Sequence, residues 1–217
     1  MIILALDTST SRCSASLFVN NLVYNIEKNT SRLHNEYVLQ IIDDLLLMAK
    51  VQKQDIDLLA CGSGPGSFVG VRLSISIMQA ISLVLKIPIV AFSSLYCIAM
   101  SVFLKKRSQV ISVLSNLNSL SVSFGHYKAK SNYSFLEIIE EKDISIRECN
   151  DFFKKPYDKN FGYIVGDDSV NKKFDFVSDV YFPNTSSILH YIKFLENKRI
   201  NNKLVLTQNH IFKETFD

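Results

Sequence analysis

One glycine cluster constrains this chain more than any other feature. Four of the seven glycines lie within nine residues, namely Gly62, Gly64, Gly66 and Gly70. Glycine allows positive φ angles and close approach of the backbone to a neighbouring group, so special geometry is needed at this one place. The apolar run 58–61 before the cluster is typical of a buried strand, and residues 69–86 after it are expected to form a long helix. The sequence therefore predicts a strand, a tight loop and a helix.

The glycine loop has two interpretations. The first amide N–H groups of a helix have no internal partner, so the loop is suited to cradling an anion. Its spacing fits neither a P-loop nor a dinucleotide fingerprint, and a tight turn with Ser67 as N-cap explains the same residues equally well. Arg72 in the first helical turn opposes the helix dipole, so we expect it to meet an acidic group or a phosphate.

A second candidate segment, residues 7–10, lies at the end of the expected N-terminal strand 2–7. Further strands are expected at 13–19 and 22–27. The segment holds a carboxylate and three hydroxyls, which at a strand end can bind phosphate oxygens or hydrated Mg²⁺. A local turn explains the segment as well, and is favoured when the segment is taken alone. With the glycine loop, the candidate phosphate site comprises Asp7, Thr8, Ser9, Gly64, Gly66 and Ser67.

The remaining pattern predicts an α/β protein with two related lobes, residues 1–104 and 105–217. In the first lobe, helix 34–50 carries a second apolar stripe, and helix 69–86 is apolar nearly all round, as expected of a helix buried on more than one side. A strand over 87–92 and a helix over 94–104 follow. The second lobe repeats this order with strands at 110–114, 120–127, 133–140 and 163–165 and a helix over 185–196.

Charge and cysteine usage exclude several classes of protein. The net charge is +3 without clustered basic blocks, so neither a nucleic-acid surface nor a membrane surface is indicated. Four widely spaced cysteines, Cys13, Cys61, Cys97 and Cys149, are expected to be reduced and mostly buried. The N-terminus carries no signal-peptide pattern, and Pro88 interrupts the most apolar stretch. We therefore expect a cytoplasmic protein.

Three segments together resemble the TsaB family, also called YeaZ: residues 3–10, 64–72 and 88–95. Members are subunits of tRNA threonylcarbamoyladenosine biosynthesis, and the resemblance covers residues 1–100 well. It implies the two-lobe actin-like, sugar-kinase and Hsp70-like (ribonuclease H-like) fold, here with a degenerate second lobe. It also implies a non-catalytic role beside TsaD, a paralogue that transfers threonylcarbamoyl to the adenosine next to the anticodon, and beside the ATPase TsaE.

The same resemblance implies how the chain assembles. The two long helices would pack on those of TsaD, or on a second copy of this chain when TsaD is absent, with tRNA contacted indirectly. The expected interface residues are Tyr37, Leu39, Leu47, Met48, Arg72, Ile77 and Ile81. The alternative is that the two helices only cover one another and the sheet. Any phosphate site would be vestigial, so ATP with Mg²⁺ is expected to bind weakly if at all.

The sequence gives less support to a catalytic function. TsaD-like proteins carry a metal-binding histidine pair where this chain has Ser94 and Ile98. None of its four histidines has another within five residues, which disfavours a peptidase with a zinc site. An ATP-dependent phosphotransferase of the same fold remains an alternative, with Asp7 at the phosphates and Asp167 or Asp168 as the acid. The second lobe departs from the family pattern and lacks its Asp-Ala-Arg segment.

Overall fold

The computed structural model describes residues 1–29, 34–129, 136–153, 161–189, 191 and 192. Its first sheet has the strand order β3-β2-β1-β4-β5, in which β1, β2 and β3 are antiparallel and β1, β4 and β5 are parallel. The strands are β1 (Ile3–Asp7), β2 (Arg12–Val19), β3 (Leu22–Asn29), β4 (Leu58–Gly62) and β5 (Ile89–Phe92). Every residue of β1 and β4 is buried, because helices cover both faces of this sheet.

The second sheet repeats the first, with the order β8-β7-β6-β9-β10 and the same pattern of parallel and antiparallel pairs. Its strands are β6 (Val110–Asn116), β7 (Ser121–Ala129), β8 (Leu136–Ser145), β9 (Tyr163–Gly166) and β10 (Asp179–Val180). This duplication is the two-lobe actin-like fold expected from the sequence. The second lobe keeps the whole strand order, although β10 has two residues and α5 (Asp168–Asn171) has four.

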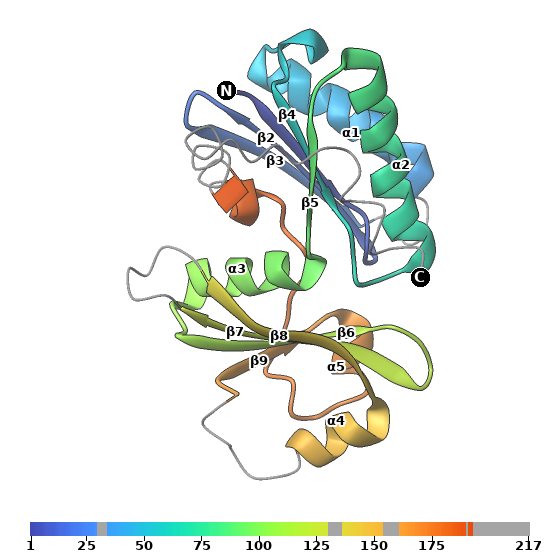
Figure 1. The fold of residues 1–217 in the computed structure, drawn as a ribbon, viewed down its shortest axis with the longest axis vertical. Coiled ribbons are helices and arrows are strands. Elements are labelled where there is room, and N and C mark those ends of the chain that lie inside the picture. Colours follow the sequence, from blue (N-terminus) through green and yellow to red (C-terminus); the bar gives the residue numbers. More distant parts are fainter. Residues whose placement is uncertain (30–33, 130–135, 154–160, 190, 193–217) are drawn as a thin grey trace.

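Helices form three layers around the two sheets (Figure 1). The outer face of the first sheet carries α1 (His34–Ala49) and α2 (Phe68–Leu85), with a short 3-10 turn, η1 (Lys53–Asp55), before β4. The outer face of the second sheet carries α4 (Ile146–Phe153) and α5, and neither helix was predicted from the sequence. Between the sheets lies α3 (Ser94–Lys106).

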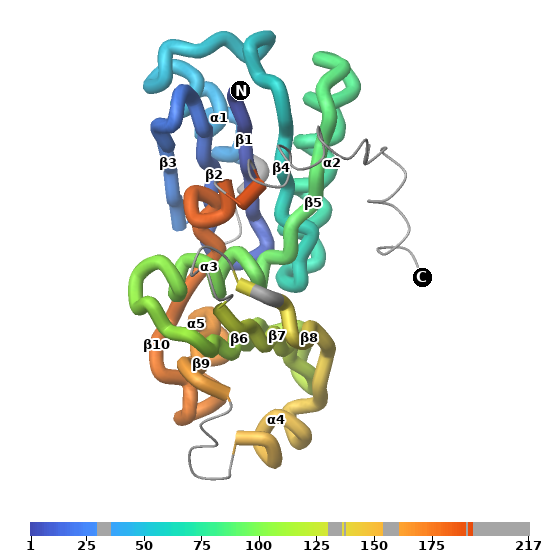
Figure 2. Tube along the Cα trace, turned by 60° about the vertical axis from the view of Figure 1, so that its left-hand side comes forward, coloured from blue at the N-terminus to red at the C-terminus, as the bar shows by residue number. Residues whose placement is uncertain are grey.

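A shared core joins the lobes. Helix α3 buries ten consecutive residues, Ser94–Phe103, and contacts β6, β7 and β8 of the second sheet. The helical residues 186–189, 191 and 192 form the orange-red segment beside α3 in Figure 2, and Ile188, Leu189 and Ile192 join α3 in the apolar cluster between the sheets. The rest of the predicted helix, 193–196, lies outside the described residues, as does 133–135 of the predicted strand. The predicted lobe boundary at residue 104 stays a prediction. It falls near the end of α3, which packs mainly on the second sheet although the prediction assigned most of it to the first lobe.

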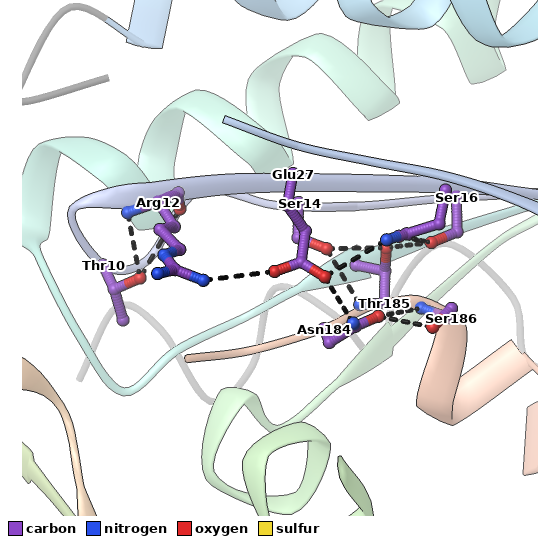
Figure 3. A network of polar contacts seen from close by, with 9 residues as sticks. Thr10, Arg12, Ser14, Ser16, Glu27, Asn184, Thr185 and Ser186 are labelled. Atoms are coloured by element: carbon purple, nitrogen blue, oxygen red, sulfur yellow. Dashed lines mark hydrogen bonds and ion pairs between the residues drawn. The ribbon is translucent and has the colours of Figure 1, made fainter. Parts of the chain in front are cut away.

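Polar contacts fasten the returning chain to the first sheet (Figure 3). The Thr185 hydroxyl lies 2.6 Å from Ser16 Oγ and 3.1 Å from Ser14 Oγ, and the Thr185 amide donates to Ser14 Oγ at 3.0 Å. Beside it, the Asn184 side-chain amide donates to Glu27. The buried Thr185 and serine groups satisfy one another, and the Asn184–Glu27 contact is exposed, so the segment after β10 has a defined position on β2 and β3.

Helix α2 turns a stripe of mostly small residues toward the sheet. The buried residues are Gly70, Ser74, Met78 and Ser82, which recur every four residues and leave 22% of the helix buried. The Ser74 hydroxyl donates to the Gly62 carbonyl at 2.9 Å, and the Ser82 hydroxyl donates to the Ile87 carbonyl at 2.7 Å. The expectation that α2 is buried on more than one side is therefore wrong for this chain by itself, because small residues let the helix approach the sheet along one stripe.

Candidate functional site

The glycine loop packs against the turn that follows β1. A Cβ atom added at Gly62 would collide with the Asp7 carboxylate, one at Gly66 with the Ser9 carbonyl, and one at Gly70 with the Thr8 carbonyl. Gly64 is needed for another reason, since its φ of 92° is unfavourable for residues with a side chain. The glycines are thus required by contacts within the chain itself.

Hydrogen bonds fix the same junction. The Ser67 amide donates to the Ser9 carbonyl at 2.6 Å, and the Thr8 hydroxyl donates to the Gly70 carbonyl at 2.6 Å. Ser67 is the N-cap of α2, and its Oγ accepts from the Gly70 amide at 3.4 Å, which confirms the capping prediction. One amide at the start of α2 is therefore already bound to the β1 turn.

Asp7 is 1% exposed, and hydroxyl groups surround its carboxylate. Oδ1 accepts from the Ser9 amide at 2.8 Å and the Ser9 hydroxyl at 2.6 Å, while Oδ2 accepts from the Ser94 hydroxyl at 2.6 Å. A buried carboxylate is stable only when such donors replace water. Asp7 therefore connects the end of β1 to the start of α3, and it is absent from the residues that line the cleft described next.

A polar cleft of about 780 Å³ lies between the lobes. The first lobe contributes Ser9, Thr10, Ser11 and 67–70, and the second contributes 115–117 and 167–169. The cleft thus brings together Ser9 and Ser67 of the candidate phosphate site with Asp167 and Asp168, the candidate acids of the phosphotransferase hypothesis. Sequence reasoning missed Ser115, Asn116 and Leu117, although the repeated order of strands offered a signal, because the turn after β6 corresponds to the turn after β1.

The two aspartates of the cleft differ in their surroundings. Asp167 is 5% exposed, and its Oδ1 accepts from the amides of Ser169 and Val170 at 3.0 Å each, as the N-cap of α5. Its Oδ2 accepts from the Ser115 hydroxyl at 2.9 Å and the Asn116 amide at 3.2 Å. Asp168 is half-buried on the cleft wall. Within the described residues, no group of three or more His, Cys, Asp or Glu side chains is placed to hold a metal ion.

The outer surface of α1 and α2 is rich in exposed apolar side chains; we call it the α1/α2 surface. Of the predicted interface residues, Leu39, Leu47 and Met48 are 60%, 78% and 55% exposed. Sequence reasoning missed four others on α2: Phe68 and Val69 at its start, and Leu83 and Val84 near its end, all at least 67% exposed. The small residues spaced four apart were the available signal, since they mark the opposite, buried side of α2.

The other predicted interface residues lie deeper or make different contacts. Tyr37, Ile77 and Ile81 are half-buried against the core, and the Lys28 ammonium lies 3.4 Å from the centre of the Tyr37 ring. Arg72 is exposed, and its guanidinium stacks 3.7 Å from the centre of the Phe68 ring. Within the described residues Arg72 forms no ion pair, so the expected acidic partner is not found in this part of the chain.

The cysteines are all free and buried, as predicted. Burial raises the pKa of the Cys13, Cys61 and Cys149 thiols to about 12, and burial also raises the pKa of Cys97. The Asp7 charge adds to this effect on the pKa of every one of these thiols except Cys149. The thiols are therefore protonated near neutral pH and unsuited to nucleophilic attack.

Comparisons with known proteins agree with this architecture. The family model of TsaD, tRNA N6-adenosine threonylcarbamoyltransferase, matches residues 22–187. The tRNA threonylcarbamoyladenosine biosynthesis protein TsaB of Buchnera aphidicola subsp. Schizaphis graminum is 31% identical over 204 residues, covering 91% of this chain and 95% of the relative. TsaB of Buchnera aphidicola subsp. Baizongia pistaciae is 30% identical over 213 residues, covering 94% and 95%.

A solved structure gives the same fold. YeaZ from Pseudomonas aeruginosa superposes with a TM-score of 0.76 at 21% identity, covering 91% of this chain and 92% of that structure. Both the sequence and the fold match over nearly the whole length, including the second lobe that departs most from the expected motifs. On the strength of this agreement, the chain belongs to the TsaB (YeaZ) family.

Proposed function

We propose that this chain is a non-catalytic subunit of tRNA threonylcarbamoyladenosine biosynthesis, which binds a TsaD-type transferase and joins a TsaE-type ATPase through that complex. The observation that carries the proposal is the similarity to proteins named TsaB over 91% of this chain and 95% of the relative. The proposed setting is the cytoplasm, with tRNA contacted through the transferase.

Several positions considered for catalysis make contacts that hold the fold together. Ser94 donates to buried Asp7, and Ile98 is 1% exposed in the core between the sheets. These are the positions at which the family resemblance places the metal-binding histidines of TsaD. Asp167, the other candidate acid, accepts four hydrogen bonds from its own lobe. These contacts support a structural role for the residues that an enzyme of this fold would need.

The α1/α2 surface supports partner binding. Large exposed apolar areas on a protein generally mark an interaction site. By length and composition alone α2 could cross a membrane, but its buried stripe packs on β4 and β1, where it is held by hydroxyl-to-carbonyl bonds. We therefore propose a protein partner for this surface, with a second copy of this chain as the occupant when the transferase is absent.

Reconstitution tests the function directly. In a reaction with purified TsaD-type and TsaE-type proteins from the same organism, threonylcarbamoyl-adenylate and tRNA, modified tRNA should form only when this chain is present. This chain with tRNA and donor alone should form none, because it lacks the transferase site. Modification at an equal rate without this chain would refute a required role, and modification by this chain alone would refute a non-catalytic one.

Nucleotide binding is a separate proposal. We expect Mg-ATP to bind weakly at most, since the Ser67 amide and the glycines of the loop are engaged by the β1 turn and the cleft wall carries Asp167 and Asp168. Titration calorimetry should show no saturation at micromolar ATP. Micromolar affinity together with turnover on a small acceptor would instead support the phosphotransferase reading.

A further inference from the structure

The mouth of the inter-lobe cleft carries apolar side chains from both lobes. Phe68 and Val69 are 67% and 72% exposed, and they belong both to the α1/α2 surface and to the cleft wall. On the other side, Leu117 lines the cleft at 38% exposure, and Leu120 in the same turn is 77% exposed. We call these four residues the cleft-mouth surface.

The turn that carries the two leucines is well defined. The amides of Leu117 and Asn118 both donate to the Ser121 carbonyl, at 3.3 and 3.2 Å, and the Ile146 amide donates to the Leu120 carbonyl at 2.9 Å. The β6–β7 turn extends on the side of the molecule on which α2 lies (Figure 1). A fixed backbone presenting a leucine to solvent is suited to contact with a protein surface.

The cleft behind this mouth is acidic and rich in hydroxyl groups. Its wall includes Asp167 and Asp168 and no lysine, arginine or histidine among the described residues. The Lys173 ammonium is held by the same turn, where it donates to Asn116 Oδ1 at 2.5 Å and to the Asn118 carbonyl at 3.3 Å, and Lys173 is not among the residues that line the cleft. Within the described part of the chain no ion pair is formed by Asp168. The cleft is therefore complementary to a cationic group.

We propose that the partner on the α1/α2 surface also spans the cleft mouth, with apolar side chains on Phe68, Val69, Leu117 and Leu120 and a lysine or arginine that enters the cleft toward Asp168. This inference rests on the proposed function, because the occupant is the transferase subunit itself. Two observations favour one occupant: Phe68 and Val69 belong both to the exposed apolar residues of α2 and to the cleft wall, and the acidic cleft wall favours a basic side chain.

Binding measurements with the full chain and the TsaD-type protein of the same organism test the proposal. Leu120→Asn and Asp168→Asn should each raise the dissociation constant about fivefold to tenfold. Asp168→Asn should also weaken the dependence of affinity on salt, since it removes a charge pair. The matched controls are Ile139→Asn on the second-lobe edge strand and Asp175→Asn, an exposed aspartate outside the cleft wall; both should bind as the wild type does.

The outcomes separate the two proposals. If the wild type binds and Val84→Glu on α2 abolishes binding while Leu120→Asn and Asp168→Asn bind normally, the cleft-mouth inference is refuted and the proposed function stands. If the wild type itself does not bind the transferase, both are refuted. If the cleft variants change only the self-association of this chain, the occupant is a second copy and the assignment to the transferase is wrong. Circular dichroism confirms that each variant is folded.

Discussion

At the scale of single residues, the junction between the β1 turn and the glycine loop determines how the first lobe is built. Asp7, Thr8 and Ser9 each contact the glycine loop or α3 through a side chain or a carbonyl. The need for unusual backbone geometry could be predicted from the glycine spacing. Its cause could not, because the atoms that exclude a Cβ belong to a turn about sixty residues away.

Gly70→Ala tests this junction. The added methyl group would collide with the Thr8 carbonyl, so the variant should lose about 1–3 kcal/mol of unfolding free energy, even though alanine favours helix by about 1 kcal/mol. Urea unfolding provides the measurement. Ser76→Ala, on the exposed side of α2, is the matched control and should change stability by less than about 0.5 kcal/mol. A Gly70→Ala variant as stable as the control would contradict the packing described here.

The surroundings of the His126 ring lead us to expect that the stability of the fold depends on pH. Its Nδ1 lies 3.0 Å from Ser112 Oγ and its ring stacks on Phe124, and burial lowers its pKa below the ordinary value despite the opposing charge of Glu140. The unfolded chain therefore binds a proton more readily than the folded one. Stability should be full above about pH 6.5 and should decline as the pH falls below that value.

Thermal unfolding between pH 5 and 8 measures this effect. His126→Phe keeps an aromatic ring in the cluster and removes the titrating group, so its melting temperature should fall less between pH 7 and 5 than that of the wild type. Equal pH slopes in the two proteins would show that His126 does not contribute. Carboxylates that titrate in the same pH range are present in both proteins, so their effect on the melting temperature cancels in the difference.

At the scale of elements, periodicity predicted the long helices and buried strands well. The predicted helices 34–50 and 69–86 agree with α1 and α2 to within one residue at each end. Hydropathy could not show which side of α2 faces the sheet, because three of the four residues of the buried stripe, Gly70, Ser74 and Ser82, are small residues that hydropathy does not mark. It also missed α4, α5 and β10, and the last two are too short to show a repeat.

Charged substitutions on the α1/α2 surface test whether this surface binds the transferase partner. Leu47→Glu and Val84→Glu, at residues 78% and 79% exposed, should abolish co-elution with the TsaD-type partner while leaving the melting temperature within a few degrees of the wild type. Ile77 is a poorer probe, since it packs on the core. Ile139→Glu, 53% exposed on β8, is the control and should co-elute. Unchanged co-elution of both variants would place the interface elsewhere.

At the scale of the whole molecule, one topology occurs twice and a shared core joins the two copies. The order of predicted elements indicated this duplication, and the strand order confirms it. The position of α3 between the sheets could not be predicted, because which sheet a connecting helix packs on depends on contacts distant in sequence. The same holds for the inter-lobe cleft, whose walls come from four separate segments. Family membership then supplies the functional setting that the cleft alone does not.

The central claim is that this chain works by pairing with a transferase. Light scattering of the purified chain mixed with the TsaD-type protein of the same organism measures this most directly. The account predicts one species whose mass equals one copy of each subunit, and about twice 24.7 kDa for this chain measured alone. Two separate species at the masses of the unmixed proteins would contradict it.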